Sequence, residues 1–153
     1  MIHQLDKIKI VEALECATNG AGLTGKWISL KNILKVLIIV QVTQATAATV
    51  ALTIEMSKLV AGTNNTAITE VIPIWSNLDT AASDVLVKRT RAVNYTTDDG
   101  VKNKVVIFEL DADRLDAEYD CINVNAGSSS GSDMVSAIYL CELRYSGADT
   151  DSD

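Results

Sequence analysis

The sequence predicts an all-β protein, built as an antiparallel β-sandwich or barrel of about eight strands. Composition is the first indication, because Val, Ile, Thr and Ala are abundant while Phe and Pro occur only once each. The second is the strict alternation of polar and apolar residues over 49–56, which is typical of a half-buried strand. The third is a series of short apolar runs separated by turn residues.

The first elements follow from the local pattern. Residues 5–15 alternate poorly and fit either a short strand or a helical turn, and we assign residues 1–20 to an N-terminal arm. Residues 17–25 are rich in Thr, Asn and Gly and mark a break. The run VLIIV at 36–40 is apolar throughout, which predicts a strand covered on both faces.

The next two strands are expected to be half-buried or to lie at a sheet margin, whereas KVVIFEL at 104–110 is expected to be another buried strand. In the stretch 49–56, Thr53 is expected to face away from the core. The opposite, core-facing set is Val50, Leu52, Ile54 and Met56. Pro73 lacks a backbone N–H, so it confines the strand EVIPIW to a sheet edge or a bulge. We expect a single domain over 1–146, followed by a disordered acidic tail at 147–153.

The segment GAGLTGKW at 20–27 carries parts of two nucleotide-binding signatures, G-x-G-x-x-G and the P-loop. Both signatures need a helix after the loop, because the helix N-terminus holds the phosphate. Here Lys26 is followed by Trp27 and by β-favouring residues, and no hydroxyl stands where Mg²⁺ coordination requires one. The sequence therefore predicts a turn, with no cofactor.

No catalytic or metal centre is expected. The single histidine, His3, lies beside the initiator Met, and no nucleophile–base pair has spacing support. The acidic connector DADRLDAEYD at 111–120 fails the EF-hand pattern, because Leu115 and Asp116 stand where an oxygen ligand and a Gly are needed. We interpret it as a solvated loop and the protein as a non-enzyme.

Charge and hydropathy limit the partners. With 13 basic and 20 acidic residues the formal net charge is −7, and such a field repels nucleic acid and anionic membranes. No apolar run reaches the ~18 residues that span a bilayer, and no secretion signal is recognisable at the start. We expect synthesis in the cytoplasm, with neither nucleic acid nor membrane as partner.

Three cysteines leave at least one thiol unpaired in a monomer. Cys141 shares a strand face with apolar residues and is expected to be buried. Cys16 abuts the glycine loop, and Cys121 lies on the face opposite Ile122, so both are expected to be exposed. Any disulfide is therefore expected to be intermolecular, through Cys16 or Cys121. Three reduced, partly buried thiols are the alternative.

Several phrases together resemble a family of small structural proteins of tailed bacteriophages. They are GLTGKWISLKN, ATVALTIEMSKLVAGT, PIWSNLDTAASDVLV, VKNKVVIFELDADRLD and VSAIYL, spread over about residues 20–145. The resemblance implies a jelly-roll-like domain that decorates and cements the virion capsid surface, made in the host bacterial cytoplasm. It also implies the major capsid protein and further copies of the chain as partners, usually in a trimer.

A different virion role is the alternative, in a tail, a baseplate or a host-attachment module that binds glycan. Glycan binding would need aromatic residues gathered on one exposed surface, and Trp27, Trp75 and Tyr95 are the available set. The two tryptophans are otherwise expected in the core or at a subunit interface.

Overall fold

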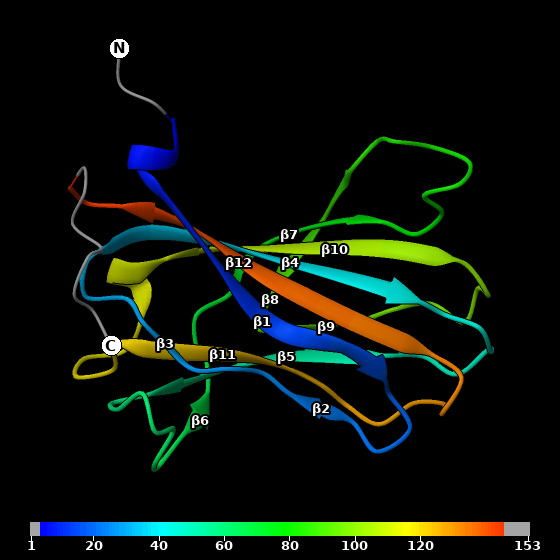
Figure 1. Cartoon of the computed structure of the whole chain (residues 1–153), viewed down its shortest axis with the longest axis horizontal. Coiled ribbons are helices and arrows are strands. Elements are labelled where there is room, and N and C mark those ends of the chain that lie inside the picture. Colours follow the sequence, from blue (N-terminus) through cyan, green and yellow to red (C-terminus); the bar gives the residue numbers. More distant parts are fainter. Residues whose placement is uncertain (1–3, 146–153) are drawn as a thin grey trace.

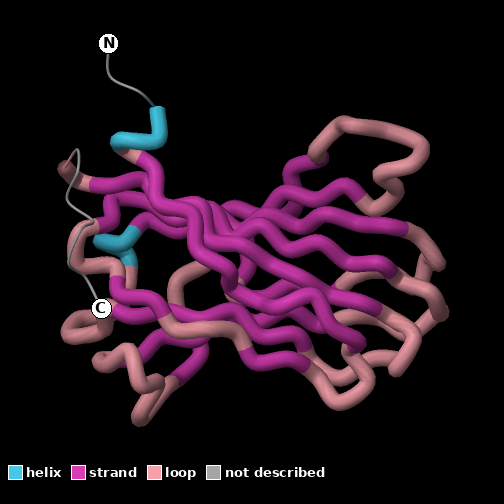
Figure 2. Tube along the Cα trace, in the orientation of Figure 1, coloured by secondary structure: helices cyan, strands magenta, loops and turns pink. Residues whose placement is uncertain are grey.

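Two antiparallel sheets packed face to face form the body of the molecule (Figure 1). The computed structural model describes residues 4–145, so His3 and the predicted tail at 147–153 lie outside the described residues. Loops gather at the two ends of the sandwich, and two short 3₁₀ helices accompany the strands (Figure 2). The prediction of an all-β sandwich is confirmed.

Sheet A contains six strands and sheet B another six. In spatial order, sheet A consists of β1 (Ile8–Thr18), β12 (Met134–Leu143), β4 (Ile33–Thr43), β10 (Asn103–Asp111), β7 (Ile72–Asn77) and β8 (Val87–Ala92). Sheet B consists of β2 (Leu23–Thr24), β11 (Cys121–Ala126), β5 (Ala51–Ser57) and β6 (Thr66–Ala67), with β3 (Ile28–Ser29) beside β11 and β9 (Asn94–Thr96) beside β5. The 3₁₀ helices are η1 (Gln4–Asp6) and η2 (Ala112–Arg114).

Strands from the first half of the chain pair with strands from the second half in a nested order, the first strand with the last. β1 pairs with β12, β2 and β3 pair with β11, and β4 pairs with β10, always antiparallel. Successive strands therefore pass between the sheets in the wrapping of a jelly roll, as the resemblance implied. Of the twelve described strands, β2, β3, β6 and β9 have only two or three residues, which leaves eight longer ones. A strand of two or three residues is too short to show alternation, and the predicted number of about eight corresponds to the longer strands.

The core lies between the inner faces of the sheets. Val50, Leu52 and Ile54 have no exposed surface and Met56 has 1%, which confirms the facing assignment in β5. In β4 only one side is covered in this way. Val36, Ile38 and Val40 are fully buried, whereas Leu37 and Ile39 remain partly exposed on the outer face. The expectation that 36–40 is covered on both faces is therefore met on one face within this chain.

Pro73 lies at a bulge. The β7–β8 register shifts between Ile72 and Ile74, and the pairing of β7 with β10 begins only at Ile74. The ladder therefore loses nothing at the residue that lacks an N–H. Most of the segment assigned to an N-terminal arm forms β1, an edge strand of sheet A that pairs with β12 through a register containing two shifts.

Two buried charged residues anchor the connection from β4 to β5. The ammonium group of Lys104 has no exposed surface and donates to Gln44 Oε1 at 2.8 Å and to the Asp98 side chain. The carboxylate of Asp133 is also fully buried and accepts hydrogen bonds from the N–H groups of Ala45 and Thr46 at 2.9 and 3.1 Å. Because each charge is paired or hydrogen-bonded, both are tolerated inside the fold.

Candidate functional site

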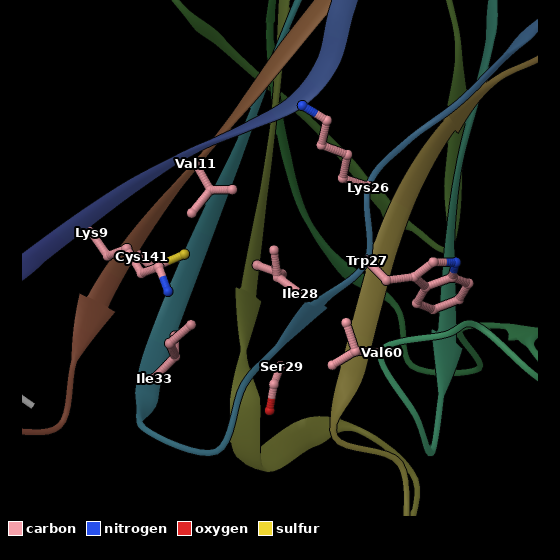
Figure 3. Close-up of a pocket in the computed structure, with 9 residues that line it drawn as sticks. All are labelled: Lys9, Val11, Lys26, Trp27, Ile28, Ser29, Ile33, Val60 and Cys141. Carbon is pink, nitrogen blue, oxygen red and sulfur yellow. The ribbon is translucent and has the colours of Figure 1, made fainter. Parts of the chain in front are cut away.

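A cleft of about 360 Å³ opens along the seam between β1 of sheet A and β3 of sheet B (Figure 3). Val11, Ile28 and Ile33 give it an apolar wall, and the Cys141 sulfur lies beside them. At its margin, the Lys26 ammonium donates to Glu12, which ties the loop before β3 to β1. The cleft has room for a small apolar group, but its lining holds no acid–base pair.

The segment 20–27 begins as the predicted turn but also contains the two-residue strand β2, and after Lys26 the chain continues into strand β3 rather than into a helix. Gly25 is required by a close approach, since a Cβ there would lie 2.2 Å from the carbonyl oxygen of Val124. Its N–H donates to the Asn125 side chain at 3.1 Å, and the N–H of Lys26 donates to the Ala13 carbonyl at 2.9 Å. The N–H groups of Gly25 and Lys26 are therefore engaged within the protein.

In the acidic connector 111–120, four carboxylates form ion pairs with basic side chains and Asp116 accepts a hydrogen bond from Thr69. These carboxylates contact partners from other segments of the described chain. These pairs are Asp111 with Lys35, Asp113 with Arg144, Asp116 with Thr69, Glu118 with Lys58, and Asp120 with Lys31. Within residues 4–145, no group of three or more His, Cys, Asp or Glu side chains is placed to hold a metal ion.

The exposure of the three cysteines differs from the sequence expectation at one position. Cys16 is exposed and Cys141 is buried, both as predicted. The predicted exposure of Cys121 is wrong, because only 2% of this residue is accessible. It does lie on the outer face of sheet B, but β11 is flanked there by Ser29 and Ser57 from neighbouring strands.

The loop after β5 is tied to Ser57, the residue that pairs with Cys121. Ser57 donates through Oγ to the carbonyl oxygen of Thr63 at 3.0 Å and is itself fully buried, so this loop folds back over the sheet. Burial raises the pKa of the Cys121 thiol to about 12, with a further contribution from its hydrogen bond to Asp120. Alternation along a single strand cannot predict this burial.

The aromatic residues proposed as interface or glycan-binding groups do not gather in one place. Trp27 packs against Gly62, where a Cβ would lie 2.2 Å from the indole nitrogen. Trp75 is on the outer face of sheet A, with the Lys88 ammonium 5.6 Å from its ring. Tyr95 contacts Ser76 on the opposite face of β7, at 3.4 Å between hydroxyl oxygens. Both tryptophans are half-buried.

The outer face of sheet A is the most extensive apolar surface that the strand registers assemble. Ile39 on β4 lies between Ile138 on β12 and Ile107 on β10, and Trp75 follows on β7. Ile138 is 39% exposed and the other three are half-buried. A contiguous apolar patch on a sheet surface is typical of a protein interface. Sequence reasoning missed Ile107 and Ile138, and the run at 36–40 was the one available signal.

Comparison with known proteins gives a weak structural similarity. No protein family model matches the chain, and no curated protein matches it either. Among solved structures, the crystal structure of the SPBc2 prophage-derived protein YomS is similar at 12% sequence identity and a TM-score of 0.45. The alignment covers 87% of this chain and 92% of that one.

Among residues 4–145, no helix combines the length and apolarity required to cross a membrane.

Proposed function

We propose that this chain is a structural protein of a tailed-bacteriophage virion, which decorates the head surface and cements the capsid shell. The observation that carries the proposal is the apolar outer face of sheet A, a surface suited to binding protein rather than a small substrate. The sequence phrases over about residues 20–145 support it, through their resemblance to small structural proteins of such phages.

The physical requirements of a cement protein match this architecture. Such a protein needs a rigid scaffold, contacts with the major capsid protein and contacts between its own copies, for which the resemblance implies a trimer. Individual contacts can be weak, because many copies act together on one lattice. A sandwich with buried, paired charges at its loops supplies the rigid scaffold.

Charge fits a position outside the shell. A formal net charge of −7 disfavours direct binding to packaged DNA, and it keeps decorated particles apart from one another. The partners we propose are therefore the major capsid protein and further copies of this chain.

Mass spectrometry of purified particles tests the role. We expect this chain at a copy number comparable to that of the major capsid protein, and we expect particles without it to break at lower temperature. A copy number of only a few per particle would favour a tail or baseplate role. Absence from the particles would refute the proposal.

A further inference from the structure

One row of side chains crosses the whole outer face of sheet A, with one residue from each strand. The strand registers place its members side by side in a continuous line. From the β1 edge to the β8 edge, the row reads Glu12, Ile138, Ile39, Ile107, Trp75 and Lys88. An acid stands at one end and a base at the other, with four apolar residues between them.

The row can pair with the same row of a second copy that runs in the opposite direction, because the acid of each copy then faces the base of the other. A two-fold axis parallel to the strands, between β4 and β10, would stack β4 on β10, β12 on β7 and β1 on β8 of a second copy. Ile39 would then meet Ile107 of that copy, and Glu12 would meet its Lys88. Sheets pack face to face about 10 Å apart with nearly aligned strands, which this arrangement allows.

We infer that the outer face of sheet A binds the same face of a second copy of this chain in a two-fold contact. The match lies within one surface, which is the condition for an isologous interface and selects a second copy over an unrelated protein. For assembly on the virion, the inference rests on the proposed function. Self-association of the purified chain can be tested independently of that function.

The sequence of β4 independently indicates that the outer face of this strand is covered by another layer of protein. The uninterrupted run at 36–40 is the pattern of a strand buried on both faces. The fold buries Val36, Ile38 and Val40 completely but leaves Leu37 and Ile39 partly exposed. A second copy stacked on sheet A supplies the missing layer.

The charges at the two ends remain available. Glu12 accepts from Lys26, yet 53% of its side chain is still exposed and its second oxygen can accept from another donor. Lys88 is exposed and lies over the Trp75 ring. Glu109, beside Leu37 on the same face, is held by Lys35 at 2.7 Å, so it adds no uncompensated charge.

The size of the surface predicts a weak contact. Six strands about 4.8 Å apart span roughly 24 Å, and three rows of outward side chains add roughly 14 Å along the strands. The resulting few hundred Å² per copy are below the roughly 800 Å² per partner of a standard specific interface. The dimer is therefore expected at high protein concentration, or where a lattice holds copies close together.

Sedimentation velocity on the purified chain tests the inference, from about 1 µM to about 1 mM, the range over which weak contacts become populated. We expect the mass to rise from monomer to dimer. Ile39→Glu should raise the dissociation constant at least about tenfold, because it buries an unpaired charge at the contact. Thr53→Glu on the outer face of sheet B is the matched control and should leave association unchanged. Circular dichroism verifies that both variants fold.

A charge exchange tests the register of the contact. Glu12→Lys and Lys88→Glu should each weaken association, and the double variant should restore it, because only the proposed stacking pairs these two side chains. Monomer at all concentrations would overturn the inference, as would a trimer or association indifferent to Ile39→Glu. So would a monomer that binds capsid shells through Ile39, since the capsid protein would then be the occupant. Absence from particles would refute the virion role alone.

Discussion

The hydroxyl of Tyr139 joins the two sheets through the core. It accepts a hydrogen bond from the backbone N–H of Val124 at 3.0 Å and donates to the carbonyl oxygen of Lys26 at 2.9 Å. Tyr139 has no exposed surface, and burial raises the pKa of its phenol, so the hydroxyl keeps the proton that it donates. It bridges β11 to the chain between β2 and β3, where the two short strands separate.

Tyr139→Phe should therefore reduce the free energy of unfolding by about 1–3 kcal/mol, because two backbone groups lose their partner inside the protein. Urea unfolding followed by circular dichroism measures the change. Tyr145→Phe, at a position 69% exposed, is the control and should have little effect. Equal stability of the Tyr139 variant and the wild type would show that the bridge contributes nothing.

The alternating direction of side chains in β5 predicts that Asp substitutions at adjacent residues have different effects on folding. Leu52→Asp and Ile54→Asp should prevent folding, because each places an unpaired carboxylate at a position with no exposed surface. Thr53→Asp should be mild, because Thr53 points to the outer face of sheet B. Soluble yield and circular dichroism of the three variants decide the matter, and equal effects at all positions would contradict the assignment.

Gly25→Ala should destabilise the fold by about 1–3 kcal/mol, since the added Cβ would lie 2.2 Å from the Val124 carbonyl oxygen and the segment between β2 and β3 must move away from β11. Gly131→Ala is the matched control, because a Cβ there meets nothing within 4 Å. Thermal unfolding of the two variants gives the comparison. If Gly25→Ala left the unfolding temperature unchanged, the loop would have room for a Cβ despite the 2.2 Å approach to the Val124 carbonyl oxygen.

Acid should weaken the protein through two carboxylates. Lys104, through its hydrogen bond, lowers the pKa of Asp98. Burial alone would raise the pKa of Asp133, but hydrogen bonds from Ser129 and from the Ala45 and Thr46 backbone outweigh it and lower the pKa. A lowered folded-state pKa contributes stability above the unfolded value of about 3.9, and this contribution is lost as pH falls below it.

Urea unfolding between pH 7 and pH 2.5 checks this dependence. The free energy of unfolding should fall below about pH 4 as protons bind first to the unfolded chain. Asp133→Asn should be less stable at neutral pH and should show a shallower acid loss. A wild-type profile that is flat below pH 4 would contradict the assignment.

Cysteine reactivity should follow the structure. Cys16 is exposed and should react with a thiol reagent in the native protein, whereas Cys121 and Cys141 should react only after unfolding. If copies cross-link in oxidised particles, the bond should therefore pass through Cys16, and Cys16→Ser should abolish it. Mass spectrometry after native alkylation and non-reducing electrophoresis of particles measure both. Native labelling of Cys121 would contradict the burial.

Much of the fold was readable because half-buried strands carry their facing in the residues themselves. The alternation around Leu52 and Ile54 determined which side of β5 enters the core, and the missing N–H of Pro73 determined that it would lie at a bulge or edge. The residues after Lys26 likewise excluded a phosphate-binding helix, because they favour a strand.

Tertiary structure decided what lies over each outward face. Period-2 alternation turns Cys121 away from the core, but only the folded chain, in which this residue is 2% exposed, shows that this side is also covered. The uninterrupted apolar run at 36–40 showed that both sides of this strand are apolar, and only the pairing of distant strands placed Ile39 between Ile138 and Ile107. Alternation is a local property of one strand, whereas the partners of a surface come from residues far away in the chain.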